Sequence, residues 1–372
     1  MYHLLRGLAQ HHTVTLLSLT DSAPSDAPAE LESLCREVCA VPRRSYNPAS
    51  VRAVTGLLSP TPRSVLDTFQ PEMAMRIEQL LKEEAIDLII ASQWWTAAYY
   101  QSFGRVPAIY EEVETGVFTS KLLQASTPLK RLRHALPLLK LRLYLRRLLP
   151  QFQACTVVSD VEKSLLQRLV PGSRNIQVIP NGVEAADYER ADQQARQSDT
   201  MIFTGSLSYA ANLDSMRWFL SEVFPKIQGQ APDTKLMITG HSDNFTLPQA
   251  NNVILTGFVD NVRPLIASAW ISLAPIRVGG GTRLKILEAM ASGTPVVATT
   301  KGAEGLQVTD GEHILLADTP NQFANAVLRL LQDGDLHQRI ADNSCRLVRR
   351  LYDWSVIMPD FLRLAQEATN VR

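Results

Sequence analysis

Cysteine is scarce in this chain of 372 residues, which contains only Cys35, Cys39, Cys155 and Cys345. No two of them have the Cys-x-x-Cys spacing of a zinc site, and no histidine lies close by in the sequence. So few cysteines exclude a disulfide scaffold and indicate a reducing compartment. We therefore expect free thiols and no metal site.

Long apolar runs and an excess of one charge are also missing. No apolar run is long enough to cross a bilayer, and no secretory signal opens the chain. Lys and Arg total 37, as do Asp and Glu, so the formal net charge is zero. A balanced chain has no overall attraction to nucleic acid. We expect a cytoplasmic protein that binds no nucleic acid.

Two common phosphate-binding motifs are absent. The chain has no Gly-x4-Gly-Lys-[Ser/Thr] P-loop and no Gly-x-Gly-x-x-Gly dinucleotide fingerprint. No Asp-x-Asp pair stands beside its glycine-rich segment, so the sequence offers no metal-held diphosphate there. Any nucleotide site must rest on other groups.

What the chain does contain is an alternation of short aliphatic runs with helix-period segments. The expected strands are Thr13–Leu19, Ile86–Ala91, Val106–Tyr110, Cys155–Ser159, Ile176–Ile179, Met201–Thr204, Lys235–Thr239, Val253–Leu255, Trp270–Ala274, Pro295–Ala298 and His313–Leu316. The expected helices include Met73–Glu84, Asp160–Val170, Asn212–Ile227 and Asn321–Gln332. Continuous aliphatic strands are typical of parallel sheets buried on both faces, so the pattern predicts an α/β doubly wound fold.

The length predicts two domains, because one core stops growing well before 372 residues. The polar stretch 184–199 has no strand pattern and strand series on both sides, which favours a linker over a surface helix within one domain. We therefore expect an N-terminal domain over 1–183 and a second over 200–346. Helices over 347–372 would follow and could return to the first domain.

The start of the chain lacks an expected element. Residues Met1–Gln10 have a helical pattern, and Thr13–Leu19 would be the second strand of a doubly wound domain. The first strand and its glycine turn are missing. We therefore expect the working enzyme to be longer, with a start codon assigned too far downstream.

The segment that points most directly to chemistry follows the expected strand Trp270–Ala274. Gly279–Gly281 form a loop, Thr282 is a suitable N-cap, and a helix is expected over Arg283–Ala291 with Leu284 on its apolar face. A glycine turn before a helix N-terminus suits a phosphate. Cations in a first turn oppose the helix dipole, so Arg283 and Lys285 fit better if an anion binds there.

Two simpler interpretations compete with this one. Lys285 and Glu288 could form only a surface pair one turn apart. Asn212 could face the bound ligand, although it is expected instead to cap the helix that begins at this position. The glycine triplet favours the phosphate-site interpretation.

The segment GGGTRLKILEAMASGTPVVAT resembles the donor-site signature of glycosyltransferase family 4. Three other stretches resemble the same subgroup: VIPNGV at 178–183, FTGSLSYAANLDSMRWF at 203–219 and LYDW at 351–354. The resemblance covers most of the chain and implies a GT-B fold, in which two Rossmann-like domains face a cleft. The N-domain would lack its first strand.

The resemblance also implies roles for residues. Glu288 would accept hydrogen bonds from the donor ribose, while Arg283 and Lys285 would offset the diphosphate charge without a metal. Loop residues Gly280, Gly281 and Thr282 would lie against the pyrophosphate, and Gly205 and Ser206 would form the second wall of the pocket.

The chain departs from the family at two further places. Many members carry a glutamate where Gly280 stands, so that contact to the sugar is missing or comes from elsewhere. Many also have His-Asn-Val-Glu where this chain has Glu111, Glu112, Val113 and Glu114. These three carboxylates are candidates for a general base or an acceptor contact, and a solvated loop is the equal alternative.

The segment Pro128–Pro150 contains seven basic residues, no acidic residue and many leucines. Such a stretch can lie on anionic lipid, or its leucines can pack on the sheet. It lacks the interleaved aromatics of a nucleic-acid surface.

Together these features predict a retaining, metal-independent glycosyltransferase without a cofactor. It would use a nucleotide-sugar donor and a glycan or lipid-linked acceptor in polysaccharide biosynthesis. The protein itself would be peripheral to the inner membrane face. The alternatives are a non-catalytic GT-B binding or regulatory protein and a nucleotide-sugar epimerase.

Overall fold

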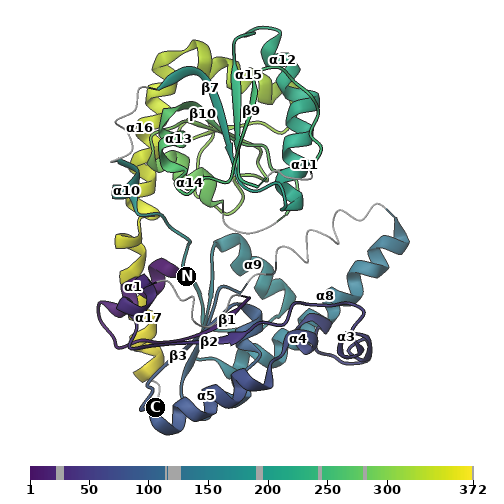
Figure 1. Cartoon of the computed structure of the whole chain (residues 1–372), viewed down its shortest axis with the longest axis vertical. Helices are drawn as coiled ribbons and strands as arrows, with labels where there is room; N and C mark the ends of the chain where they lie inside the picture. Colours follow the sequence, from purple (N-terminus) through teal and green to yellow (C-terminus); the bar gives the residue numbers. More distant parts are fainter. Residues whose placement is uncertain are drawn as a thin grey trace. The chain divides into compact units, whose positions relative to one another are not determined.

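The computed structural model describes residues 1–21, 29–113, 115, 127–189, 196–241, 245–279 and 283–370, with the backbone alone at 128–134 and 189. The chain forms two compact units (Figure 1). Unit 1 comprises Met1–Ile179 and Met358–Arg372, and unit 2 comprises Pro180–Ile357. The chain therefore leaves unit 1 once and returns to it at its C-terminal end.

Unit 2 contains a six-stranded parallel sheet in the order β12-β11-β10-β7-β8-β9. Its strands are β7 (Gln197–Thr204), β8 (Lys235–Thr239), β9 (Val253–Gly257), β10 (Ala269–Ala274), β11 (Val296–Ala298) and β12 (Leu315–Leu316). Its helical segments are α10 (Ala185–Glu189), α11 (Ala210–Trp218), a π-helical turn (Phe219–Val223), α12 (Phe224–Gln228), α13 (Arg263–Ser268), α14 (Leu284–Ala291), α15 (Pro320–Gln332) and α16 (Gly334–Leu351). This alternation is the predicted doubly wound pattern.

Helices cover both faces of this sheet (Figure 1). Met201 and Phe203 of β7 face the core formed with α11, α12 and α15, whereas Ile202 between them faces α13 and α14. All three side chains are fully buried. Their continuous aliphatic pattern follows from this two-sided burial.

Unit 1 contains two separate parallel sheets, β1-β2 and β3-β4-β5-β6. The strands are β1 (Thr15–Thr20), β2 (Glu37–Pro42), β3 (Ile89–Ser92), β4 (Ala108–Glu111), β5 (Ala154–Val157) and β6 (Ile176–Val178). The helices are α1 (Tyr2–Ala9), α2 (Ala29–Leu34), α3 (Val51–Thr55), α4 (Arg63–Thr68), α5 (Pro71–Glu83), α6 (Gln93–Ala97), α8 (Pro128–Leu148) and α9 (Asp160–Leu169), with 3-10 turns at Tyr100–Phe103 and Leu149–Gln151. The last helix, α17 (Trp354–Asn370), runs from unit 2 into unit 1.

The break between the two sheets lies between β1 and β3. Leu17 and Leu19 of β1 pack against the same core as Ile89 and Ala91 of β3, yet in the described part of the chain β1 pairs only with β2. A doubly wound domain places its first strand between strands two and four. The break between β1 and β3 therefore lies at the position that a first strand occupies in such a domain.

Several expectations need correction. The stretch 184–199 is not a free linker, because α10 occupies Ala185–Glu189 and β7 begins at Gln197. The division between the units falls after Ile179 instead of after Val183. Helix α10 forms inside the expected linker because its residues Ala185 and Tyr188 are buried in unit 2.

Other elements were missed or misjudged. β2 was not expected, because its Glu37 and Cys39 interrupt the aliphatic pattern. The expected helix Asn212–Ile227 contains a π-helical turn before Pro225. The C-terminal helices begin at Gly334, well before 347. The expected return of the last helix to the first domain is confirmed, because α17 enters unit 1 at Met358.

Candidate donor site and carboxylate site

The donor-site residues that lie far apart in the sequence meet at one end of the unit 2 sheet. Gly205 follows β7 with φ of +134°, and a Cβ there would lie 2.8 Å from Asn212 Nδ2 and 3.1 Å from Lys285 Nζ. Gly240 follows β8 with φ of +106°, and a Cβ there would lie 2.7 Å from Ser206 N. Both positions therefore require glycine, since any side chain would displace Asn212, Lys285 or the Ser206 backbone.

Lys285 is held inside this cluster. Its Nζ donates to Asn212 Oδ1 at 3.0 Å and lies 3.9 Å from the centroid of the Phe203 ring. The pKa of the Lys285 ammonium is lowered to about 7, mainly by burial and in part by nearby Arg283. A partly buried cation that lies beside an amide oxygen and a ring is suited to binding an anion.

Asn212 does not cap α11, contrary to expectation. The helix N-cap is Tyr209, and Asn212 Nδ2 donates to Ser206 O at 2.8 Å while Oδ1 accepts from Lys285. Asn212 is buried and so fixes both Lys285 and the strand end. The sequence offered one signal, a polar residue one turn into a helix that follows Gly205.

The start of α14 differs in detail from the prediction. Arg283 is the N-cap without a side-chain cap bond, and Leu284 is exposed. Arg283 itself is buried, and its Nη2 donates to Lys301 O at 3.2 Å. The expected loop residues Gly280, Gly281 and Thr282 lie outside the described residues.

Glu288 lies on the same helix, one turn after Lys285. It accepts a hydrogen bond from Tyr188 Oη at 3.2 Å. Burial raises the pKa of the Glu288 carboxyl, while Tyr188 and Lys285 oppose that shift. Glu288 and Lys285 are therefore partly buried and bonded to residues of other elements, which favours the site interpretation over a simple surface pair.

Tyr188 was not foreseen. It comes from α10, inside the stretch expected to be a linker, and is buried. The Arg263 guanidinium lies 5.2 Å from the centroid of its ring and pairs with Asp187 at 3.0 Å. Ring and ion pair thus hold the Tyr188 hydroxyl beside Glu288.

A second polar cluster lies in unit 1, where β3 and β4 end. Glu111 is 5% exposed and accepts a hydrogen bond from Ser92 Oγ at 2.6 Å. The pKa of Glu111 is raised to about 7, mainly by burial and in part by the adjacent Glu112, while the hydrogen bond from Ser92 opposes the shift. A carboxyl with this pKa can exchange a proton near neutral pH.

The residues that follow these strands have strained backbones. Gln93 and Glu112 have φ of +67° and +59°, uncommon for residues other than glycine. Gln93 Nε2 donates to Glu112 Oε2 at 3.2 Å. Strain of this kind is concentrated at functional sites. Ser92 and Gln93 were not predicted as site residues, although the carboxyl ends of neighbouring parallel strands always meet at the same end of a sheet. The third predicted carboxylate, Glu114, lies outside the described residues.

No group of His, Cys, Asp and Glu able to hold a metal occurs among the described residues. Among the same residues, no helix combines the length and apolarity that a membrane span requires.

Comparison with protein families covers both units. Residues 1–182 match the family described as glycosyl transferase 4-like domain, and residues 198–333 match glycosyl transferases group 1. Phosphatidyl-myo-inositol mannosyltransferase of Mycobacterium tuberculosis is 32% identical over 202 residues. The match covers 50% of this chain and 52% of that protein, so the chain spans about half the length of this curated relative.

Solved structures resemble the whole chain. A crystal structure of Anabaena HepE in complex with UDP and glucose has a TM-score of 0.66 and 17% identity, covering 97% of this chain and 94% of that one. Sucrose-phosphate synthase from Thermosynechococcus elongatus has a TM-score of 0.70 and 18% identity, covering 98% and 91%. At these identities the likeness shows the fold. Together with the matches over both units, it identifies this chain as a member of the family 4-like glycosyltransferases with a GT-B fold.

Proposed function

We propose that this chain is a retaining glycosyltransferase that moves a sugar from a nucleoside-diphosphate donor to a glycan or lipid-linked glycan acceptor in polysaccharide biosynthesis. The observation that carries the proposal is the buried Lys285 ammonium at the Gly205 strand end, with Glu288 one turn further along α14. A diphosphate would supply the anion that Lys285 lacks, and Glu288 would accept hydrogen bonds from the ribose.

Metal-free stabilisation of the leaving diphosphate follows from the same groups. When the sugar leaves, negative charge grows on the diphosphate, and fixed cations next to it lower the energy of the transition state. Arg283 and Lys285 supply those cations from one helix start. Retention at the anomeric carbon is what family 4 membership implies.

Unit 1 supplies groups that suit the acceptor. A Glu111 carboxylate with a pKa of about 7 can accept the proton of an acceptor hydroxyl, and Glu112 can hold a neighbouring hydroxyl. For a lipid-linked acceptor, the basic segment 128–150 would place the protein on the anionic inner face of the cytoplasmic membrane.

The test is a screen of nucleotide sugars with purified protein, measuring donor hydrolysis and transfer in chelator. Release of nucleoside diphosphate, with the sugar found on an acceptor in its original anomeric configuration by NMR, supports the proposal. Tight donor binding without turnover would indicate a binding protein. Conversion of the donor sugar to its epimer without an acceptor would indicate an epimerase.

A further inference from the structure

Residues 46–58 hold a group of exposed large hydrophobic side chains. Leu58 is 95% exposed and Val51 79%, and Val54 and Leu57 are each about half exposed, at 49% and 48%. All four come from α3 and the turn that follows it. Clustered exposed apolar residues mark a binding surface, whereas isolated ones do not.

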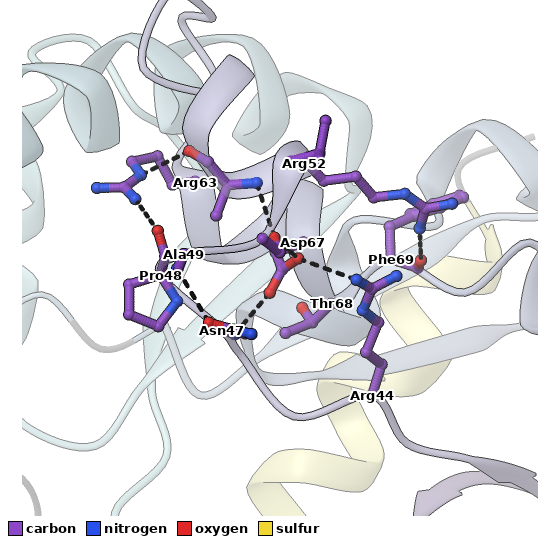
Figure 2. A network of polar contacts seen from close by, with 12 residues as sticks. Arg44, Asn47, Pro48, Ala49, Arg52, Arg63, Asp67, Thr68 and Phe69 are labelled. Carbon is purple, nitrogen blue, oxygen red and sulfur yellow. Dashed lines mark hydrogen bonds and ion pairs between the residues drawn. The ribbon is translucent and has the colours of Figure 1, made fainter.

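A buried polar network holds this segment outward. The fully buried Asp67 carboxylate of α4 accepts hydrogen bonds from Asn47 N at 2.7 Å and from the Ser50 hydroxyl, and pairs with Arg44 at 3.5 Å (Figure 2). The Ser50 hydroxyl and the Asn47 N–H lower the pKa of Asp67, so it stays charged. Ser50 is also the N-cap of α3, accepting from Ala53 N.

Arg63 completes the support. Its Nε donates to Ala53 O at 2.7 Å and its Nη2 to Pro48 O at 2.6 Å (Figure 2). A five-residue helix such as α3 is not stable alone, so these bonds fix its position. Buried polar contacts thus hold four apolar side chains in exposed positions. Exposure of apolar side chains to water costs free energy unless another molecule covers them.

A second helix continues the surface. Lys140 of α8 donates from Nζ to Gly56 O at 2.9 Å and to Leu57 O at 2.6 Å, which joins α8 to the turn after α3. Leu136 and Leu143, which share the Lys140 face of α8, are 50% and 39% exposed. The opposite face packs into the unit 1 core through other leucines. The packing interpretation of this helix is therefore confirmed for that face, and the lipid interpretation stays a prediction for the exposed one.

The sequence segments that form this surface are rich in basic residues. Residues 38–66 contain four arginines and no acidic residue, and 128–150 contain seven basic residues and no acidic residue. Arg142, Arg146 and Arg147 of α8 are exposed. Since the whole chain has no net charge, this is a local excess.

We propose that α3, its following turn and the exposed face of α8 form a membrane-binding surface, in which Leu57 and Leu58 enter the apolar layer and the α8 arginines contact anionic headgroups. Apolar side chains beside basic ones match an anionic lipid surface. Two copies of the chain meeting through this patch would place like charges together, which disfavours a symmetric dimer. Binding to lipid needs neither donor nor acceptor, so it is tested separately from sugar transfer.

The experiment is sedimentation of the full chain with vesicles of phosphatidylcholine, with and without phosphatidylglycerol, over a range of salt. The apolar test variant is Leu57→Ser with Leu58→Ser. Its matched control is Ile254→Ser with Leu255→Ser on β9, an adjacent aliphatic pair with 47% and 51% exposure in unit 2. The charge variant is Arg142→Gln with Arg146→Gln and Arg147→Gln.

We expect the Leu57 and Leu58 change to weaken binding to anionic vesicles at least about tenfold while keeping its salt dependence. The charge variant should lose most of the salt dependence, and the β9 control should bind like the unaltered chain. In Leu58→Trp, brominated lipid should quench the added indole fluorescence. These outcomes together support the surface.

Equal binding by the Leu57 and Leu58 variant would overturn the proposal, as would an equal loss in the β9 control. It would also be overturned if that variant changed only the mass of the protein in solution by light scattering, which would indicate a protein interface. Absence of quenching in Leu58→Trp would show that the side chain at position 58 does not enter the apolar layer of the membrane.

Discussion

The two units are built from the same strand–helix alternation, but only unit 2 has an uninterrupted sheet. In β10 five of six residues are buried and the strand is paired on both sides. In β1 no residue reaches full burial, and in the described chain its edge toward β3 is unpaired. Paired central strands bury backbone and side chains together, so unit 2 has the rigid core and unit 1 the weaker one.

The difference extends to chemistry. In unit 2, Lys285 and Glu288 project from α14 at the carboxyl ends of an uninterrupted row of strands. This fixes the position of the Lys285 ammonium, the cation proposed to bind a phosphate. In unit 1, Glu111 and Glu112 stand at the end of β4, which pairs with β3, the strand that borders the break. Donor binding should therefore depend on single side chains, whereas acceptor chemistry should also depend on the integrity of unit 1.

The largest expected effect is on the donor side. Lys285→Met should lower affinity for the nucleoside diphosphate by about 1.5–3 kcal/mol, because one charge-assisted hydrogen bond is lost. Calorimetry with UDP and other diphosphates measures this. Lys226→Met, at an exposed position of α12, is the control and should bind normally. Unchanged affinity in Lys285→Met would place the anion elsewhere.

The pH dependence of donor binding tests the same residue. The pKa of Lys285 is about 7 in the free protein, and a bound diphosphate would raise it. Binding then takes up a proton, so affinity is fully present below pH 7 and falls as the pH rises above 7. The decline should disappear in Lys285→Met. A pH-independent affinity in the unaltered chain would contradict the assignment.

In unit 1 the largest expected effect is on stability. Asp67→Asn removes the charge that accepts from Ser50 and Asn47 and should destabilise unit 1 by about 1–3 kcal/mol. Amide hydrogen exchange read by mass spectrometry should show faster exchange in α3, α4 and β1, and no change in β7 or β10. Equal acceleration in both units would mean that they do not unfold separately.

A smaller effect is expected for Tyr188→Phe, which removes one hydrogen bond to Glu288 but keeps the ring. Donor affinity should change by about 0.5–1.5 kcal/mol, less than for Glu288→Gln, which should cost about 1.5–3 kcal/mol. Titration calorimetry on the two variants and their double mutant gives the coupling. Additive effects would show that Tyr188 does not act through Glu288.

Chelator should have no effect on turnover, the smallest change of all. The proposed cations, Arg283 and Lys285, belong to the chain itself. Turnover lost in chelator and restored by Mg²⁺ or Mn²⁺ would show that they are insufficient.

Much of the fold could be predicted from local patterns. Aliphatic runs located eleven of the strands, because strands buried on both faces need nonpolar residues at consecutive positions. The same reasoning missed β2, where Glu37 pairs with Arg76 at the sheet edge and Cys39 faces both. An edge strand that uses side-chain ion pairs has no continuous aliphatic signal.

The site was predicted in part. Residues whose signals lie close together in the sequence were found, and residues whose roles depend on distant contacts were not. Lys285 and Glu288 could be found because a glycine turn, a helix start and misplaced cations lie within ten residues of one another. Tyr188 and Asn212 could not, because their roles depend on contacts across 100 and 73 positions in the chain.

The sequence by itself therefore determined the α/β class, the family and the helix that carries the candidate donor groups. These depend on local propensity, nonpolar periodicity and short motifs. Tertiary structure alone decided that Lys285 lies partly buried beside Asn212 and Phe203, that Tyr188 donates a hydrogen bond to Glu288, and that Leu57 and Leu58 are exposed to water. Burial and pairing are set by residues distant in the chain, and no local pattern records which of them will meet.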